Sequence, residues 1–480
     1  MIYEKDNKAQ WMLSDIRAMN SIFENIYFNS PIFLQNIMVS AYGYKLYRER
    51  YIGNHDRYLK GLLKSQYYSE EQLNAFVEEQ FFSMLGHAIK NVPYYRDLVR
   101  VGRIDPRDIK GAKDINILPL IKKDQIRENP RYYLAGGFKE NDLIVINTSG
   151  TTGKTLKIFV DKDSRRYSYA FYTRLKLWAG IEGKPENVTF AGRIIVPPDV
   201  DHPPFWRRNA TMNNYLFSSY HLSWTNLKYY VEALQKIQPY FIDSYPSSIF
   251  IVARYMKENG LRGIYPKAII TSAETLLDYQ REIVEEIFQC PVYDQYGSAE
   301  QVVFVSQCEK GSYHVHPEFG IVEFLREDGS EAMPGEPARL ICTGFTNRAM
   351  PLLRYDIGDV GVRSEKKCPC GRNYPVIEKI VGRNDDLLIT PDGCQVGRLD
   401  PIFKGLQSIK EAQIIQENYD NVVVKIVPGS TFCENDAQVV IKELQKRLGS
   451  QVSVTLTIVD SIPRTSAGKF KAVISKVRRS

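Results

Sequence analysis

Two short segments, far apart in the chain, carry residue types that could act on a phosphate group. The first reads Thr-Ser-Gly-Thr-Thr-Gly-Lys at residues 148–154, and the second reads Pro-Arg-Thr-Ser-Ala-Gly-Lys-Phe at residues 463–470. Glycine N–H groups can wrap phosphate oxygens, hydroxyls add donors, and Lys154 adds a point charge. The second segment places Lys469 behind a small turn that could carry it into a distant site. The spacing of a Walker A loop is missing, and an ordinary turn is the alternative for residues 148–154.

A second cluster combines three cysteines with a histidine. Cys308, His314, Cys368 and Cys370 have the ligand count of a closed structural Zn²⁺ site. His316 competes for the histidine position, and buried free cysteines are the alternative for the whole cluster. A zinc ion here would hold a β-rich region together and would take no part in catalysis.

The composition excludes several functional classes. With 480 residues, 44% of them hydrophobic and 25% charged, the chain is of the ordinary globular type and long enough for two to four domains. A formal net charge of +7 suits an anionic ligand such as a nucleotide, and it does not indicate nucleic acid. Seven cysteines without framework spacing favour a reducing compartment. Residues 1–14 have mixed charges and lack the apolar core of a secretory signal, so we expect a cytoplasmic protein.

One segment near the start of the chain has no charge over twenty residues. It spans residues 25–44 and is followed by Lys45, Arg48 and Arg50. Because it contains a proline and several amide and hydroxyl side chains, it is too polar to span a bilayer. A helix packed on the main body is the favoured interpretation, and a peripheral membrane contact is the alternative.

The elements that must position these residues change in character along the chain. Residues 1–90 are predicted to form a helical extension, because residues 70–91 place apolar side chains at spacings of three and four. From about residue 140, short apolar runs alternate with helical stretches, which indicates βαβ units and largely parallel sheets. The predicted strands are 143–146, 187–190, 240–244, 268–271 and 292–296, and the predicted helices are 225–238, 247–259 and 278–288.

Unusual motifs follow two of these predicted strands, where ligands of such sheets bind. They are Ser-Ala-Glu at residues 272–274 and Tyr-Gly-Ser-Ala-Glu at residues 296–300. A large domain is predicted over residues 91–384, with a β-rich part at 305–380. A last α+β unit of residues 385–480 would carry the lysine loop, with a strand, a helix at 434–448 and another strand at 452–459.

Five motifs in order give the chain a specific resemblance. Thr-Ser-Gly-Thr-Thr-Gly-Lys, Tyr-Gly-Ser-Ala-Glu, Tyr-Asp-Ile-Gly-Asp (355–359), Gly-Arg-Asn-Asp-Asp (382–386) and the lysine loop resemble the core motifs of adenylate-forming (AMP-forming) acyl-ligases. The chain is most similar to the phenylacetate-CoA ligase branch, and within it to CapK-like proteins of polysaccharide gene clusters. The likeness runs from about residue 91 to the C-terminus and includes the Cys-Pro-Cys knuckle. It implies an α/β fold with a large N-terminal domain of parallel-rich sheets, the β-rich subdomain and a small mobile C-terminal domain.

The resemblance also implies a nucleotide site. The residues matched to the β- and γ-phosphates of ATP are Thr148, as a catalytic residue, with Ser149, Gly150, Thr151, Thr152, Gly153 and Lys154. Those matched to adenine and ribose are Ser272, Ala273, Glu274, Asp294, Tyr296, Gly297, Ser298, Asp359 and Arg383.

Two catalytic roles follow from the same resemblance. Glu300 would place Mg²⁺ on the phosphates, and Lys469 would bridge the carboxylate and the α-phosphate as negative charge develops there. Each assignment has a structural alternative: Glu300 as a carboxylate at a helix N-terminus, Asp359 as a turn residue, Tyr296 as core and Lys469 as a solvated lysine.

Later steps of the reaction are less well defined by the motifs. Asp385 matches the position about which the C-terminal domain of the family turns between half-reactions. Tyr220, His221 and Tyr245 fall near the acyl pocket, and they suggest a polar or aromatic acid, with His221 equally suited to a structural role. The arginine usual in the family's Tyr-Arg-Thr-Gly-Asp motif is replaced by Asp356, which puts the acceptor in question.

We therefore predict an AMP-forming ligase that activates a small carboxylic acid as an acyl-adenylate, using ATP and Mg²⁺. Coenzyme A is the default acceptor, and an amine of a sugar or amino acid in polysaccharide synthesis is the alternative. A catalytically inactive nucleotide-binding scaffold is the rival from another class. The presence of Lys469 and Glu300 argues against that rival.

Overall fold

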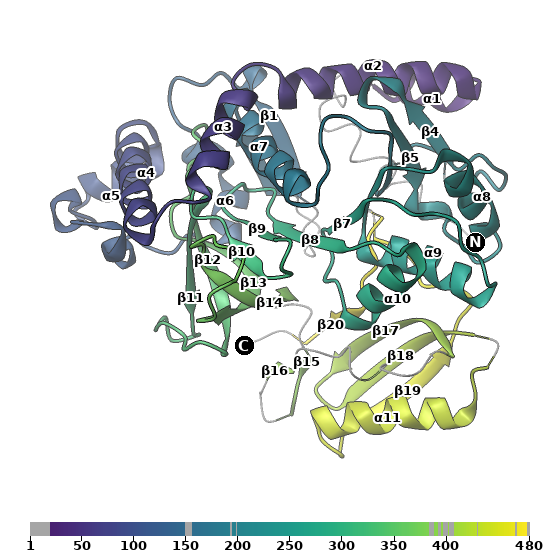
Figure 1. The fold of residues 1–480 in the computed structure, drawn as a ribbon. Coiled ribbons are helices and arrows are strands. Elements are labelled where there is room, and N and C mark those ends of the chain that lie inside the picture. The colour runs from purple at the N-terminus through teal and green to yellow at the C-terminus, as the bar shows by residue number, and fades with distance from the viewer. Residues whose placement is uncertain are drawn as a thin grey trace.

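One long mixed sheet runs through the larger part of the molecule (Figure 1). The computed structural model describes residues 20–148, 156–192, 194–197, 199–383, 388–391, 395–396, 402, 408–429, 431–465 and 468–477. The strands of the sheet are β3 (Asn187–Ala191), β4 (Trp206–Asn209), β5 (Asn214–Ser218), β6 (Phe241–Ser244), β7 (Ala268–Ser272), β8 (Val292–Gly297), β9 (Phe304–Gln307), β10 (Tyr313–Val315), β11 (Gly320–Leu325), β12 (Pro337–Gly344), β13 (Tyr355–Ser364) and β14 (Val376–Arg383).

The strand order joins a parallel half to an antiparallel half. It reads β11-β12-β13-β14-β10-β9-β8-β7-β6-β3-β5-β4. Strands β5, β3, β6, β7 and β8 pair in parallel, as the alternation of apolar runs with helices predicts. Strands β8 to β14 pair antiparallel, which accounts for the predicted β-rich part. The prediction of an α/β fold with parallel-rich sheet is confirmed, and both halves belong to a single sheet.

Three helices of the parallel half match their predicted positions closely. They are α8 (Leu227–Ile237), α9 (Pro246–Glu258) and α10 (Asp278–Phe288). Their apolar sides join strands β3, β6, β7 and β8 in one buried cluster. Apolar residues of these strands, such as Val188, Ile242 and Ile269, are buried in that cluster.

The strand predicted at residues 143–146 has a different place from the one expected. It forms β1 (Ile144–Thr148), which pairs antiparallel with β2 (Leu156–Val160) in a separate two-stranded sheet. Antiparallel neighbours need only a short connection, whereas a parallel pair needs a crossover of a dozen or more residues. The seven residues between the two strands, 149–155, lie outside the described residues.

The first part of the chain is helical, as predicted. Its helices are α1 (Asn20–Asn29), α2 (Ile32–Tyr51), α3 (His55–Ser65), α4 (Glu70–Asn91) and α5 (Pro93–Arg100), followed by α6 (Lys123–Glu128) and α7 (Lys162–Trp178). Helix α4 has the predicted bounds and begins with a capping box, in which Ser69 and Gln72 satisfy each other's backbone N–H groups.

Helix α2 contains most of the uncharged segment. It buries Val39, Gly43 and Leu46 and lies along α7 and β4, which confirms the expected packing on the main body. Phe33 and Ile37 stay exposed on its outer side. No helix in the described part of the chain is long and apolar enough to cross a membrane. The peripheral membrane contact stays a prediction.

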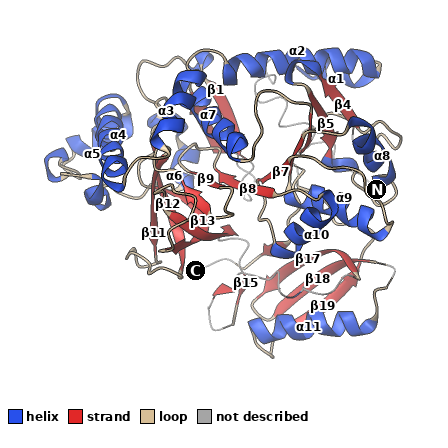
Figure 2. Ribbon diagram, in the orientation of Figure 1, coloured by secondary structure: helices blue, strands red, loops and turns tan. Residues whose placement is uncertain are grey.

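A smaller α+β unit holds the C-terminal part of the chain (Figure 2). Its four-stranded sheet has the order β19-β18-β17-β20, and α11 covers one face of that sheet with Val440 and Leu444 in a core of its own. The elements are β15 (Leu388–Ile389), β16 (Gln395–Val396), β17 (Ile409–Asn418), β18 (Asn421–Pro428), α11 (Glu434–Leu448), β19 (Ser453–Ile458) and β20 (Val473–Ser475). The helix and strand predicted here are confirmed, while the proposed boundaries at residues 90 and 384 stay predictions.

Candidate functional site

Tyr296 and Asp359 meet at the centre of the candidate site. The Tyr296 hydroxyl donates a 2.6 Å hydrogen bond to Oδ2 of Asp359, although β14, β10 and β9 separate their strands in the sheet order. The sheet must therefore curl strongly between β8 and β13. Burial, reinforced by the charge of Asp359, raises the pKa of Tyr296 well above its usual range, so the phenol stays a donor.

The second oxygen of Asp359 is the unusual feature of this pair. Oδ1 is buried and has no hydrogen-bond partner among the described residues. A buried acceptor without a partner costs roughly 1–3 kcal/mol. A hydroxyl-bearing ligand at this carboxylate would supply the missing donor.

Glu300 lies close by and is fixed by Tyr355. The side chain of Glu300 is 5% exposed, and its Oε1 accepts a 2.9 Å hydrogen bond from the hydroxyl of the fully buried Tyr355. Burial and the charge of Glu300 raise the pKa of Tyr355 well above its usual value. Sequence reasoning does not single out Tyr355, although it is the first residue of the Tyr-Asp-Ile-Gly-Asp motif.

The predicted adenine residues lie at the ends of β7 and β8. Ala273 has a φ of +70°, a left-handed turn that carries Glu274 away from the strand. Ser298 accepts a long 3.4 Å hydrogen bond from the N–H of Val302, just after Gly297 ends β8. Both oxygens of Asp294 are occupied, by the hydroxyls of Thr271 at 2.6 Å and Tyr313 at 2.9 Å.

The described residues of the lysine loop bond to one another and lie against the large domain. The N–H of Lys469 donates to Oγ1 of Thr465 at 3.1 Å, and the N–H of Gly468 donates to the carbonyl of Thr465 at 2.8 Å. Gly468 has a φ of +70°, and a Cβ at this position would be 2.6 Å from Cα of Gly192. Backbone therefore meets backbone at the residue before Lys469.

Of the predicted acid-pocket residues, Tyr220 lies beside this loop. Tyr220 is one of the closest neighbours of Gly468, and its hydroxyl donates to the carbonyl of Gly192 at 3.1 Å. Tyr245 occupies the N-cap position of α9. Both ring nitrogens of His221 are engaged, with Ser218 at 2.8 Å and the carbonyl of Pro197 at 3.1 Å, and burial lowers its pKa. Protein partners therefore already hold the imidazole of His221.

Several predicted residues fall outside the described part of the chain. Arg383 is placed by its backbone, directly across from Asp359 in the pairing of β13 with β14. The backbone of Thr148 pairs with Leu156. Ser149, Gly150, Thr151, Thr152, Gly153, Lys154 and the predicted hinge residue Asp385 lie outside the described residues.

The cysteine and histidine cluster is brought together as one group. The ligand atoms of Cys308, His314, Cys368 and Cys370 all lie within 4.8 Å of one another. Burial lowers the pKa of His314 to about 4, which keeps its ring in the neutral form that binds metals. Four soft donors at this separation fit a tetrahedral Zn²⁺ ion.

His316, the rival for the fourth position, belongs to a neighbouring network. Its Nε2 bonds with Ser306 Oγ at 2.8 Å and its Nδ1 contacts the guanidinium of Arg174. Arg174 forms a 2.8 Å ion pair with Glu318 in which both side chains are completely buried. With both nitrogens of His316 occupied, His314 is the histidine that the geometry assigns to the cluster.

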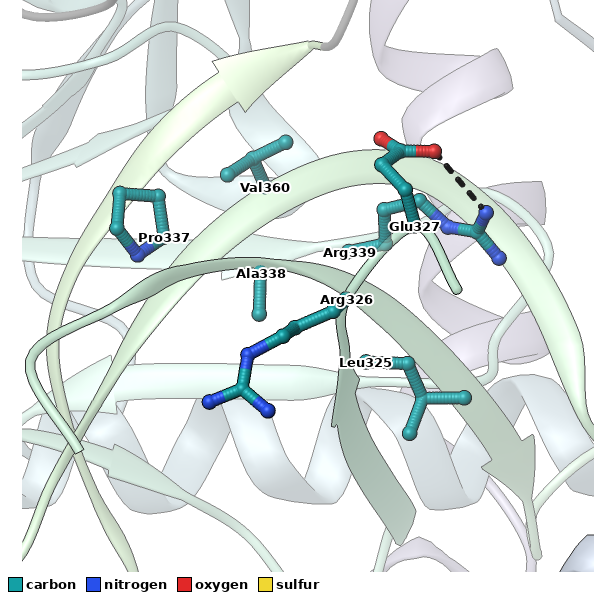
Figure 3. Close-up of a pocket in the computed structure, with 7 residues that line it drawn as sticks. All are labelled: Leu325, Arg326, Glu327, Pro337, Ala338, Arg339 and Val360. Atoms are coloured by element: carbon teal, nitrogen blue, oxygen red, sulfur yellow. Dashed lines mark hydrogen bonds and ion pairs between the residues drawn. The ribbon is translucent and has the colours of Figure 1, made fainter. Parts of the chain in front are cut away.

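A separate hollow lies on the antiparallel half of the sheet (Figure 3). Its volume is about 320 Å³, and its walls include Arg326, Arg339 and Val360. Arg326 pairs with Glu336 at 2.7 Å and Arg339 with Glu327 at 3.4 Å, so acidic side chains already meet both guanidinium groups. We assign no ligand to this hollow.

Comparison with known proteins identifies relatives along nearly the whole chain. Residues 388–476 match the family model described as the CapK C-terminal domain. The protein named CapK from Staphylococcus aureus is 32% identical over 462 residues, which cover 94% of this chain and 99% of that protein. Phenylacetate-coenzyme A ligase from Thermus thermophilus is 23% identical and covers 84% of this chain and 96% of its own length.

A solved structure shares the fold. The crystal structure of 2-hydroxyisobutyryl-CoA ligase in the postadenylation state, in complex with R3-HIB-AMP, has a TM-score of 0.68 at 18% identity. The match covers 86% of this chain and 91% of that one. The fold predicted from the five motifs is thereby confirmed.

Proposed function

Because the chain belongs to the phenylacetate-CoA ligase family of AMP-forming ligases, in its CapK-like branch, we propose that it activates a carboxylic acid as an acyl-adenylate. The carboxylate oxygen would attack the α-phosphorus of ATP, and pyrophosphate would leave. The acyl group would then pass to an acceptor as AMP departs. The observation that carries this proposal is the buried Oδ1 of Asp359, which has no hydrogen-bond partner among the described residues, beside Tyr296.

The nucleoside would be held by the Tyr296–Asp359 pair. An ionised carboxylate can only accept hydrogen bonds, and the ribose offers two hydroxyl donors. Tyr296 already occupies Oδ2, so Oδ1 is the atom that lacks a donor among the described residues. Arg383, opposite Asp359 on the neighbouring strand, would reach the ribose or a phosphate.

The phosphates would be held by residues 148–154 and by a magnesium ion. Glu300 fits that ion, because Mg²⁺ prefers few carboxylates together with phosphate oxygens, and the bond from Tyr355 keeps the carboxylate in one orientation. When bound, Mg²⁺ would neutralise charge on the phosphates of ATP. Lys469 would stabilise the charge that develops between the acid and the α-phosphate.

Coenzyme A is the acceptor that we propose, and the acid pocket would lie near Tyr220 and Tyr245. Relatives named as CoA ligases support a thiol acceptor. The alternative is an amine of a sugar or amino acid in polysaccharide synthesis, and Asp356 in place of the family's usual arginine keeps that alternative open. An inactive scaffold would bind the nucleotide at a site that lacks catalytic residues. The presence of Glu300 and Lys469 argues against it.

The four-residue cysteine and histidine cluster would bind structural zinc. Cys308 and His314 come from the β9–β10 region, whereas Cys368 and Cys370 come from the connection between β13 and β14. A metal ion would tie these two parts of the antiparallel sheet together at a position away from the reaction. No chemical step depends on it.

Acid-dependent exchange of pyrophosphate into ATP tests the first half-reaction. Exchange should occur with one or more members of a panel of aryl, hydroxy and amino acids, and it should collapse in Lys469→Ala. Lys476→Ala is the matched control, because Lys476 lies in the same small domain and pairs with Glu417 on its surface. Exchange missing across the whole panel would favour the scaffold. Mass spectrometry of products formed with CoA or with amines identifies the acceptor.

A further inference from the structure

Glu274 joins three separate segments of the chain at the entrance of the lysine loop. Its Oε1 accepts a 2.6 Å hydrogen bond from the N–H of Phe470, and its Oε2 accepts a 3.0 Å bond from the N–H of Ser247. Phe470 directly follows Lys469, and Ser247 belongs to the first turn of α9. One carboxylate therefore connects β7, α9 and the C-terminal domain.

We propose that Glu274 is the positioning residue that locks the lysine loop in the adenylation position. The bond from Phe470 fixes the peptide unit on the C-terminal side of Lys469. On the other side, Gly468 is pressed against Gly192 and Ser219, where an added Cβ would lie within 2.7 Å of both. Lys469 is thus held from both sides by the large domain. This role differs from the adenine contact that the resemblance implies for Glu274.

The surroundings of Glu274 offset part of the cost of burying its charge. Backbone N–H groups bind an ionised carboxylate about twice as strongly as a neutral acceptor, because the bond is charge-assisted. Burial raises the pKa of Glu274, while the bonds from Ser247 and Phe470 and the charge of Arg464 oppose that rise. The first turn of α9 adds the positive end of a helix dipole.

Arg464 gives the loop a rigid support of its own. Its guanidinium lies 4.7 Å from the centre of the Phe470 ring and forms an ion pair with Glu411 on β17. The aromatic ring is thereby tied to the small domain, while its backbone N–H is left to bond with Glu274. Arg464 thus holds the Phe470 ring within the small domain, and Glu274 is the acceptor for the Phe470 N–H.

The lock has a defined consequence for the reaction. It would favour the half-reaction that needs Lys469 in the site, and it must open before a half-reaction that needs the loop to leave. This part of the inference rests on the proposed function. The physical contact does not rest on it, so the two can be tested apart.

Hydrogen–deuterium exchange of the full-length chain tests the contact without any substrate. Glutamine has one acceptor oxygen where glutamate has two, so Glu274→Gln must lose one of the two backbone bonds. We expect the Phe470 amide to exchange on the order of ten times faster in this variant. Glu282→Gln, an exposed glutamate on α10, is the matched control and should leave exchange unchanged.

The same measurement separates positioning from a local structural role. Glu274→Ala removes both acceptor oxygens, so it frees both N–H groups whichever bond Glu274→Gln keeps. If Glu274 only caps α9, exchange will change at Ser247 and stay unchanged at Phe470 even in Glu274→Ala, and the proposal is overturned. Should Glu274→Gln fail to fold, Glu274→Asp, whose shorter side chain cannot reach both N–H groups, decides in the same way.

The half-reactions supply a second, independent readout. Glu274→Gln should slow acid-dependent exchange at least tenfold and leave acyl transfer from a supplied acyl-adenylate within twofold of the unaltered chain. Equal losses in both half-reactions would overturn the positioning role. If the unaltered chain shows no exchange with any acid, the proposed function fails, while faster hydrogen exchange at Phe470 would still establish the contact.

Discussion

Tyr296 and Asp359 are joined by a 2.6 Å hydrogen bond, although three strands lie between theirs in the sheet. The sheet must therefore curl to bring the two side chains together. The bond holds one carboxylate oxygen and leaves the other buried without a donor among the described residues. A protein interior tolerates few such atoms, because each one has lost its water without gaining a partner. Oδ1 of Asp359 is therefore an acceptor that a hydroxyl donor would satisfy.

Replacing Asp359 should weaken nucleotide binding more than replacing Tyr296. Asp359→Ala removes a hydrogen bond to a charged acceptor, worth about 1.5–3 kcal/mol, and should raise the KM for ATP by roughly 10- to 100-fold. Tyr296→Phe keeps the ring and should raise it only a few-fold. Exchange assays at varied ATP concentration measure both. An unchanged KM in Asp359→Ala would place the ribose elsewhere.

Zinc should be present in the purified chain at about one ion per molecule. Cys368→Ser should lose that ion and melt at a lower temperature, because a structural ion contributes binding free energy to the folded state. Cys433→Ser is the control, since Cys433 is an exposed cysteine of the small domain outside the cluster. Elemental analysis with thermal melting gives both values, and a metal-free preparation that melts identically would contradict the assignment.

The buried ion pair of Arg174 and Glu318 should be among the most sensitive positions in the large domain. Arg174→Met leaves the Glu318 carboxylate buried without its cation, which we expect to lower the free energy of unfolding by about 3–5 kcal/mol. Lys367→Met breaks the exposed pair with Glu70 and should cost less than about 1 kcal/mol. Urea unfolding measures both, and equal losses would show that burial adds nothing to the Arg174 pair.

Asp294 should make the chain less stable as pH rises from about 4 to 6. Burial raises its pKa to about 6 from a usual value of 3.8, so the folded state holds a proton in this range that the unfolded state releases. The free energy of unfolding should fall by up to about 3 kcal/mol across this range and then level off. Asp294→Asn should remove that part of the slope, whereas the exposed Asp420→Asn should not. Denaturant midpoints of the unaltered chain and both variants, measured at several pH values, test this prediction.

Several helices and strands could be predicted because each is a local pattern. Residues 70–91 and 278–288 form helices with the predicted bounds, since the apolar spacing that defines each helix is present in its own sequence. The strand at residues 143–146 shows the limit of this reasoning. Its apolar run predicted a strand, but nothing local distinguishes pairing with β7 or β8 from pairing with β2.

The site could be predicted by type but not by arrangement. Glu300, Asp359 and the metal cluster followed from motifs, whereas the partners of Glu300 and Glu274 depend on how the sheet curls and where the small domain lies. Tyr355 could have been found, because it begins a motif that was already recognised. Ser247 and Phe470 could not have been found, because each bonds to Glu274 through its backbone N–H. Nearly every residue type has that N–H group, so the sequence does not reveal such a donor.

At Gly468 the two domains approach so closely that there is no space for a side chain. Its φ of +70° and the 2.6 Å separation that a Cβ at this position would have from Cα of Gly192 leave room for a hydrogen atom and for nothing larger. Gly468→Ala should therefore leave each domain folded and exclude the loop from the site, which tryptic cleavage after Lys469 would report as faster cutting. A single added methyl group would then keep the two domains apart, although the structure of each domain would be unchanged.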